Sequence, residues 1–185
     1  MTKVALIGAS GAAGSRILKE LSDRGHEVTA IARNPQKIAV LPRVRAVQVD
    51  ANDQAALAAA LRGHEAVISA VHFTASDPRT LIGAVRDAGV PRYLVVGGAG
   101  SLEVAPGQRL VDQPDFPDVY KPEALKGAEF LELLRRSAGD LAWTFLSPSA
   151  LFVPGQRTGQ FRLGRDQLLA GPDGSRISFE DFAVA

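Results

Sequence analysis

The sequence contains no cysteine, and only one tryptophan and one methionine among its 185 residues. Without cysteine the chain has no disulfide, no thiolate metal site and no cysteine nucleophile, and we expect a reducing, cytoplasmic location. No apolar run approaches the ~20 residues of a membrane-spanning helix, so we expect no membrane partner. Neither sign of charge is in excess, because 21 Lys and Arg balance 20 Asp and Glu. This balance argues against nucleic acid as the main partner.

The length and composition predict one folded domain over residues 1–185, because 46% of the residues are hydrophobic and 22% are charged. Short apolar runs without strict alternation recur along the chain, as expected for strands that are covered on both faces. These runs are Val4–Ile7, Val28–Ala32, Val44–Val49, Ala66–Val71, Tyr93–Val96 and Leu141–Leu146.

Helical stretches separate the apolar runs. Ala12–Arg24 and Asn52–Arg62 each end at a glycine, a third helix begins at Pro78 and closes at Gly89, and Pro122 opens a fourth. Strand and helix in regular alternation are typical of a parallel sheet with crossover helices. The sequence therefore predicts the α/β class, with a Rossmann-like doubly wound sheet that carries helices on both faces.

The second half of the chain is less regular. Residues 97–120 and 147–170 are expected to be loops that shape a substrate pocket. Within the second loop, Phe161–Leu163 and Gln167–Leu169 suggest a small hairpin about Gly164. Near the end, Ser178 followed by Asp181 resembles a capping box for a final helix.

Charged residues in this half suggest solvated surfaces rather than a site. On the helix opened by Pro122, acids and bases are interspersed, which favours a solvated face. The residues concerned are Lys121, Glu123, Lys126, Glu129, Glu132, Arg135 and Arg136. Asp112, Asp115 and Asp118 lie three apart in a proline-rich loop without His, Cys or EF-hand spacing, so we expect no metal site.

The most informative motif is the glycine-rich run from Gly8 to Gly14, which follows the first strand and opens the first helix. In dinucleotide-binding loops the first glycine allows a sharp turn, the second lets backbone approach a pyrophosphate, and the third lets the helix pack on the sheet. The helix N-terminus then offers free N–H groups to the anion. The predicted cofactor contacts in this run are Gly8, Ser10, Gly11, Ala12, Ala13 and Gly14.

The end of the second strand indicates which dinucleotide binds. Sites that prefer NAD usually place an acidic residue there for the ribose 2′-hydroxyl. This chain has Arg33 instead, followed by Asn34 and Lys37. A guanidinium can bond the 2′-phosphate, and one such charge-assisted bond contributes about 1.5–3 kcal/mol. The sequence therefore predicts NADP(H) rather than NAD(H).

Residues that close the next two strands extend the predicted site. Asp50, with Ala51 behind it, either flanks the adenine or caps the following helix. Ala70 and Val71 close the fourth strand beside the point where such sheets open their crevice, and their small size lets a ribose lie close. His72 follows them, either facing the substrate or serving as a structural or surface histidine.

Several segments together resemble a known family. They are Gly8–Gly14, Ala30–Pro35, Gly97–Ser101, Trp143–Pro148 and Ile177–Ala183, which span nearly the whole chain. The sequence is similar to atypical short-chain dehydrogenases/reductases with NAD(P)H-binding domains. It most resembles the NADH-flavin reductase-like branch, which is related to NmrA-like proteins and biliverdin reductase B. The resemblance implies the Rossmann fold and an NADP(H) site, to which Pro148 would also belong.

The catalytic residues of the resembling families are only partly present. Many short-chain dehydrogenases use a serine with a Tyr-x-x-x-Lys pair, and Ser101 and Tyr120 match the serine and tyrosine. Ala124, however, stands where the lysine belongs. The histidine that follows a proline in biliverdin reductase relatives is also missing, because Ser149 follows Pro148. Ser101 and Tyr120 remain the best catalytic candidates, although a turn serine and a surface tyrosine are the alternatives.

The missing lysine and histidine favour one class of acceptor. A carbonyl substrate needs a well-placed proton donor, whereas a flavin or quinone receives the hydride first and can take its proton from solvent. We therefore expect an NADPH-dependent oxidoreductase with a flat apolar slot for a flavin, quinone or similar planar acceptor. The candidate walls are Phe73, Leu102, Tyr120, Pro148 and Phe152. The alternative is a regulator that senses NADP(H) without turnover, as NmrA-like proteins are thought to do.

Overall fold

A computed structural model describes all 185 residues. Six parallel strands form the central sheet in the order β3-β2-β1-β4-β5-β8. They are β1 (Lys3–Ile7), β2 (Glu27–Ala32), β3 (Val44–Gln48), β4 (Ala66–Ser69), β5 (Arg92–Val96) and β8 (Ala142–Leu146). The strand order reverses between β1 and β4, which confirms the predicted doubly wound, Rossmann-like class.

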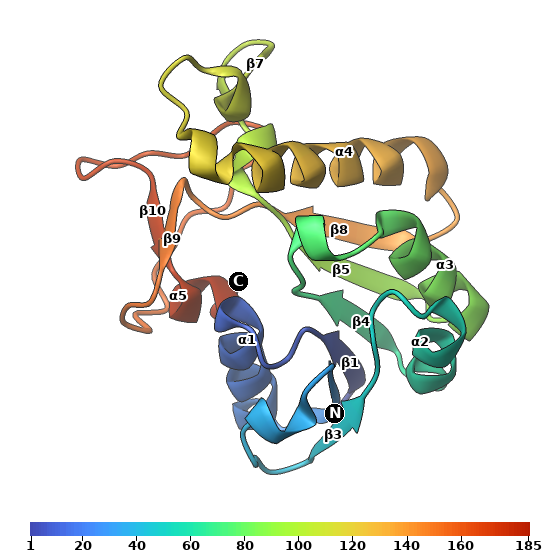
Figure 1. Cartoon of the computed structure of the whole chain (residues 1–185). Helices are drawn as coiled ribbons and strands as arrows, with labels where there is room; N and C mark the ends of the chain where they lie inside the picture. The colour runs from blue at the N-terminus through green and yellow to red at the C-terminus, as the bar shows by residue number, and fades with distance from the viewer.

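Helices cover both faces of the sheet (Figure 1). The α-helices are α1 (Ala12–Asp23), α2 (Gln54–Leu61), α3 (Pro78–Ala88), α4 (Lys121–Ser137) and α5 (Phe179–Val184). Short 3-10 turns are η1 (Pro35–Lys37), η2 (Phe73–Ala75), η3 (Ala99–Ser101), η4 (Leu110–Asp112) and η5 (Asp118–Tyr120). α1 and α5 pack on one face, whereas α2, α3 and α4 pack on the other. No helix is both long and apolar enough to cross a bilayer.

The predicted helix ends agree with the structure. Asp53 and Asp77 cap α2 and α3, since their carboxylates accept hydrogen bonds from the N–H groups of Ala56 and Arg79. Gly89 ends α3 with a left-handed backbone, at φ 68°. Ser178 caps α5 by accepting a hydrogen bond from the Asp181 N–H. Side-chain caps of this kind satisfy donors that have no partner within the helix.

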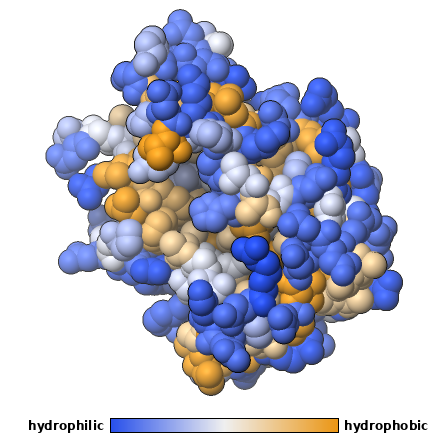
Figure 2. All heavy atoms as spheres, viewed as in Figure 1, coloured by the Kyte–Doolittle hydropathy of each residue, from blue (hydrophilic) through white to orange (hydrophobic).

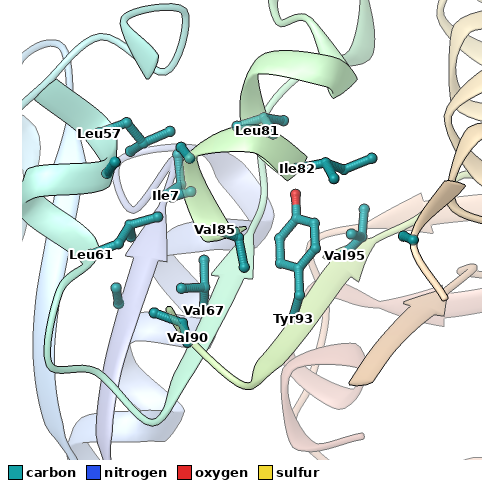
Figure 3. Packing of buried hydrophobic residues seen from close by; sticks show 14 of the residues in the cluster. Ile7, Leu57, Leu61, Val67, Leu81, Ile82, Val85, Val90, Tyr93 and Val95 are labelled. Atoms are coloured by element: carbon teal, nitrogen blue, oxygen red, sulfur yellow. The ribbon is translucent and has the colours of Figure 1, made fainter. Parts of the chain in front are cut away.

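The larger of two cores lies under α2, α3 and α4, and Figure 3 shows part of it. Tyr93 on β5 is fully buried there, with its hydroxyl 3.0 Å from the Ser69 hydroxyl. Burial raises the pKa of Tyr93 well above its usual value, and the hydrogen bond with Ser69 only partly offsets this effect. Tyr93 is therefore a neutral core residue whose one polar atom is satisfied.

The smaller core lies between the sheet and α1 with α5. Glu20 of α1 is buried beside it and accepts hydrogen bonds from Arg157 and Arg24. Asp181 of α5 accepts hydrogen bonds from the N–H groups of Thr158 and Gly159. These two carboxylates hold the segment after Val153 against the helices.

The irregular second half differs from its prediction. The predicted hairpin about Gly164 is absent from the structure. Residues 161–169 form no strand, and Gln167 makes only an isolated bridge to Glu103. Short sheets appear elsewhere, from strands of only two or three residues, which are too short to show a periodic hydrophobic pattern. They are β6 (Glu103–Ala105) with β7 (Gln108–Arg109), and β9 (Leu151–Val153) with β10 (Arg176–Ser178).

Candidate functional site

The carboxyl ends of the strands open into one cavity of about 840 Å³ at the switch point between β1 and β4. The start of α1 and the start of α4 lie on opposite sides of this region (Figure 1). In Figure 2, apolar surface gathers left of centre, in the region that Figure 1 places between these two helices. Ligands of doubly wound sheets bind at this kind of crevice.

The glycine loop is shaped by close backbone contacts. Gly8 has φ +84°, and a Cβ there would collide with the Ala70 carbonyl group. A Cβ at Gly14 would collide with the Gly8 carbonyl oxygen, while one at Gly11 would lie 3.3 Å from the same oxygen. Only residues without side chains fit at Gly8 and Gly14. The loop thus brings the end of β1 and the first turn of α1 together beside the cavity.

The first turn of α1 has no internal acceptor for its N–H groups. Its N-cap is Gly11, which provides no side-chain hydrogen bond, and the turn carries no acidic residue. The N–H groups and the helix dipole therefore present positive potential at this end. Because the adjoining cavity is open and its glycine lining lets a ligand approach the backbone, this arrangement fits the pyrophosphate of a dinucleotide.

The predicted cofactor residues share this cavity, with one exception. Its lining includes Gly8, Ser10, Gly11, Ala12, Ala13, Arg33, Asp50, Ala51, Ala70, Val71 and Pro148. Gly14 lies behind the loop, where it packs on the Gly8 backbone. This placement agrees with the roles that the motif assigns to each glycine, and the binding itself remains a prediction.

Arg33 and Asp50 differ in how they are held. Arg33 follows β2 and is exposed, with no hydrogen bond or ion pair from its guanidinium. Asp50 follows β3, and its carboxylate accepts a hydrogen bond of 2.9 Å from the Asn52 N–H. Asp50 therefore holds the turn before α2 and lines the cavity. The predicted helix-capping role of Asp50 was wrong, because Asp53 is the N-cap of α2. The Arg33 guanidinium keeps all its donors for a ligand.

The cavity also has apolar and aromatic walls. Phe73, Tyr120, Pro148 and Phe152 line it as predicted walls. Leu102 does not; it lines a separate cavity of about 80 Å³.

The two catalytic candidates are placed differently. Tyr120 is 64% exposed and closes η5 immediately before α4, where it lines the cavity. Ser101 is absent from the cavity lining, and its hydroxyl donates to the Gly98 carbonyl at 3.4 Å. The structure therefore brings Tyr120, but not Ser101, to the cavity.

Glu123 was predicted to lie on a solvated face, and this prediction was wrong. Its carboxylate accepts hydrogen bonds from the Phe73 N–H at 2.7 Å and from the N–H and hydroxyl of Thr74 at 2.9 and 2.7 Å. Burial by itself would raise the pKa of Glu123, but the bonds from Thr74 and Phe73 and the nearby His72 outweigh it, so the pKa is lowered. The spacing along α4 gave no sign of these partners.

Other charges of α4 behave as predicted. Lys126 pairs with Glu129 at 2.7 Å and Arg135 with Glu132 at 2.8 Å, in both cases with exposed side chains. Such pairs contribute little to stability. Glu123 differs from them because it faces η2 rather than solvent.

Aromatic packing holds two of the cavity walls. The Phe73 ring stacks on Phe145 at 6.1 Å and meets the edge of Phe130 at 6.1 Å. On the other side, Phe152 contacts Phe179 with ring centroids 4.5 Å apart. Phe179 also lines the cavity, and sequence reasoning missed it because β9–β10 pairing brings it there.

Comparison with known proteins shows which family the chain belongs to. A family model described as NAD(P)H-binding matches residues 8–185. The chain belongs to this NAD(P)H-binding family. The predicted membership, and with it the fold class, is thereby confirmed.

Similar proteins occur in several bacteria. The chain is 42% identical to the uncharacterized protein YwnB of Bacillus subtilis over 192 residues, which covers 99% of the chain and 89% of YwnB. A crystal structure from Burkholderia pseudomallei, provisionally named an exported protein, is 46% identical with a TM-score of 0.89, over 100% of this chain and 90% of that one. A Streptococcus pneumoniae structure, provisionally named an NADH-flavin reductase, is 38% identical with a TM-score of 0.84, over 100% and 90%.

Proposed function

We propose that this protein is an NADPH-dependent oxidoreductase that passes hydride to a planar acceptor of the flavin or quinone class. The observation that carries the proposal is one cavity whose lining includes both the glycine loop and several aromatic side chains. A nicotinamide cofactor needs the glycine loop, and a flat acceptor fits between apolar and aromatic walls.

The chain's own part is binding and orientation. The free N–H groups at the start of α1 would hold the pyrophosphate, and the small side chains of Ala70 and Val71 would let a ribose approach the sheet. The bound nicotinamide supplies the hydride. Because the protein then needs to align two flat rings, apolar walls and exclusion of water are its main contributions.

The preference for NADPH rests on Arg33. Its guanidinium has no partner in the chain and lines the cavity after β2, where a ribose 2′-phosphate would lie. The acidic residue predicted to flank the adenine, Asp50, follows β3 rather than β2, and its carboxylate accepts a hydrogen bond from the Asn52 N–H.

Three features support a planar acceptor. Phe73, Tyr120 and Phe152 give the cavity aromatic walls. The Tyr-x-x-x-Lys pair of carbonyl reductases is absent, because Ala124 takes the place of its lysine. The Streptococcus relative, at 38% identity, is named for flavin reduction.

A second candidate is a sensor that binds NADP(H) without turnover. It is favoured by the missing pair and by the hydroxyl of Ser101, which bonds Gly98 outside the cavity lining. One assay separates the two functions: protein is mixed with NADPH and riboflavin, FMN or menadione, and the loss of NADPH absorbance is followed. Turnover supports the reductase. NADPH binding without turnover of any of these acceptors favours the sensor.

A further inference from the structure

His72 stands at the edge of the cavity with one ring nitrogen already engaged. It follows β4, its side chain is 85% exposed, and it lines the cavity. Its Nδ1 lies 3.2 Å from Oε1 of Glu123. The neighbouring η2 turn begins at Phe73, directly after His72.

Two anchors hold His72 in this place. The Glu123 carboxylate accepts hydrogen bonds from the N–H groups of Phe73 and Thr74, so the backbone after His72 is fixed to α4. The Phe73 ring packs against Gly127, where a Cβ would lie only 2.7 Å from the ring. The histidine is thus exposed but attached to a fixed backbone, which favours a defined orientation of its ring.

The partner of Nδ1 decides the tautomer. Glu123 is ionised at neutral pH because its pKa is lowered, and a carboxylate only accepts hydrogen bonds. Nδ1 must therefore carry a proton. Nε2 is left as the nitrogen that gains and loses a proton, and it is free for a molecule in the cavity.

We propose that His72 is the proton donor of the reductase, acting through Nε2, and that Glu123 is its positioning residue. This inference rests on the proposed function. The acceptor gains hydride at one atom as the nicotinamide C–H bond breaks, so that NADPH is oxidised and the acceptor is reduced by two electrons. The Nε2–H bond of the His72 imidazolium breaks, and its proton passes to a second atom of the acceptor. Water then returns a proton to Nε2, which the exposure of the ring permits.

The charges around His72 are consistent with this role. Glu123 from α4 is the charged group in contact with the ring. Arg33, Asp50 and Asp115 line the same cavity, and none of them forms a hydrogen bond or ion pair with His72. The Glu123 carboxylate can accept the hydrogen bond from Nδ1–H whether or not Nε2 carries a proton, so it can hold the ring orientation throughout a cycle.

The test begins with the free protein. Nitrogen-15 NMR of the His72 ring at alkaline pH is expected to show the proton on Nδ1. Glu123→Gln should shift the population toward the Nε2–H tautomer, and Glu129→Gln, the same change at an exposed site of α4, should not. A wild-type ring that carries its proton on Nε2 overturns the proposal.

Activity gives the second readout. With NADPH and menadione at saturation, His72→Ala should lower the rate about tenfold or more, while NADPH affinity is retained. Added imidazole should restore the rate of His72→Ala and leave the wild type unchanged. The wild-type rate should fall on the alkaline side as the imidazolium is lost, and this limb should be absent in His72→Ala.

The outcomes separate two failures. If the wild type turns over and His72→Ala keeps its rate and pH profile, the proton donor is overturned and the proposed function stands. A lower rate with weakened NADPH binding and no rescue by imidazole also overturns it, because His72 would then serve the cofactor. If the wild type reduces no acceptor, the proposed function and this inference both fail.

Discussion

Gly14 packs so closely on the carbonyl oxygen of Gly8 that no side chain fits between the first turn of α1 and the end of β1. This contact fixes where the free N–H groups of α1 meet the cavity. The glycines of the loop therefore act through packing as well as through access to a ligand.

Gly14→Ala tests this packing. The added methyl group meets the backbone of Gly8 and Ala9, and we expect a loss of about 1–3 kcal/mol in the free energy of unfolding, with weaker NADPH binding. Gly139→Ala is the matched control, because nothing lies within 4 Å of a Cβ at Gly139. Urea denaturation and a fluorescence titration with NADPH measure the two effects. Equal stability and affinity in both variants would contradict the packing role.

Arg33→Ala tests the cofactor preference. The guanidinium is expected to bond the 2′-phosphate, so its loss should weaken NADPH binding roughly 10–150-fold and leave NADH affinity nearly unchanged. Arg62→Ala removes an exposed arginine outside the cavity lining and should change neither. The comparison requires both dissociation constants for each variant at one salt concentration. An unchanged NADPH-to-NADH ratio in Arg33→Ala would remove the basis for NADP(H).

The Glu20–Arg157 pair predicts a pH-dependent stability. Hydrogen bonds from Arg157, opposed by burial and aided by Arg24, lower the pKa of Glu20 to about 2. Because the folded-state pKa is below that of the unfolded chain, near ~4.3, the contribution is present above that value and is lost as the pH falls toward 2. Glu20→Gln should cost about 1–2 kcal/mol at neutral pH.

The difference in unfolding free energy between wild type and Glu20→Gln should shrink as the pH falls from 5 to 2 in urea denaturation. Lys19→Gln, which removes an exposed pair with Asp23, serves as the control and should change stability little. A Glu20→Gln deficit that is constant with pH would contradict the ionic origin.

Ser69 and Tyr93 form the one buried hydroxyl pair on the α2–α4 side of the sheet. Ser69→Ala should cost about 1–3 kcal/mol, because it leaves the Tyr93 hydroxyl buried without a partner. Tyr93→Phe in the same background removes that hydroxyl and should recover part of the loss. A double-mutant cycle by thermal denaturation measures the coupling. Additive effects would show that the hydrogen bond has no stabilising role.

The fold could be predicted because its signals are local. Apolar runs such as Val28–Ala32 need no alternation when both faces are covered, and glycines such as Gly89 mark helix ends by their positive φ. The loop from Gly8 to Gly14 also acts locally, since strand, turn and helix follow one another in the chain. For these elements, neighbouring residues determine the structure.

The remaining parts depend on contacts between distant segments. The sequence pattern predicts that Glu123 belongs to a charged helix face. In the structure its carboxylate accepts hydrogen bonds from the backbone N–H groups of Phe73 and Thr74, about 50 residues away. Phe179 reaches the cavity through the pairing of β10 with β9, and each of these strands has only three residues. Short pairings and backbone donors leave no periodic pattern in a sequence.

The proposed function depends most on the nucleotide that the glycine loop holds. A crystal structure grown with NADP⁺ tests it directly. We predict the pyrophosphate against the N–H groups of the first turn of α1, the 2′-phosphate within hydrogen-bond reach of Arg33, and the nicotinamide on the side of His72 and Tyr120. A loop from Gly8 to Gly14 that stays empty at saturating NADP⁺, or a nucleotide bound outside this cavity, would contradict the account.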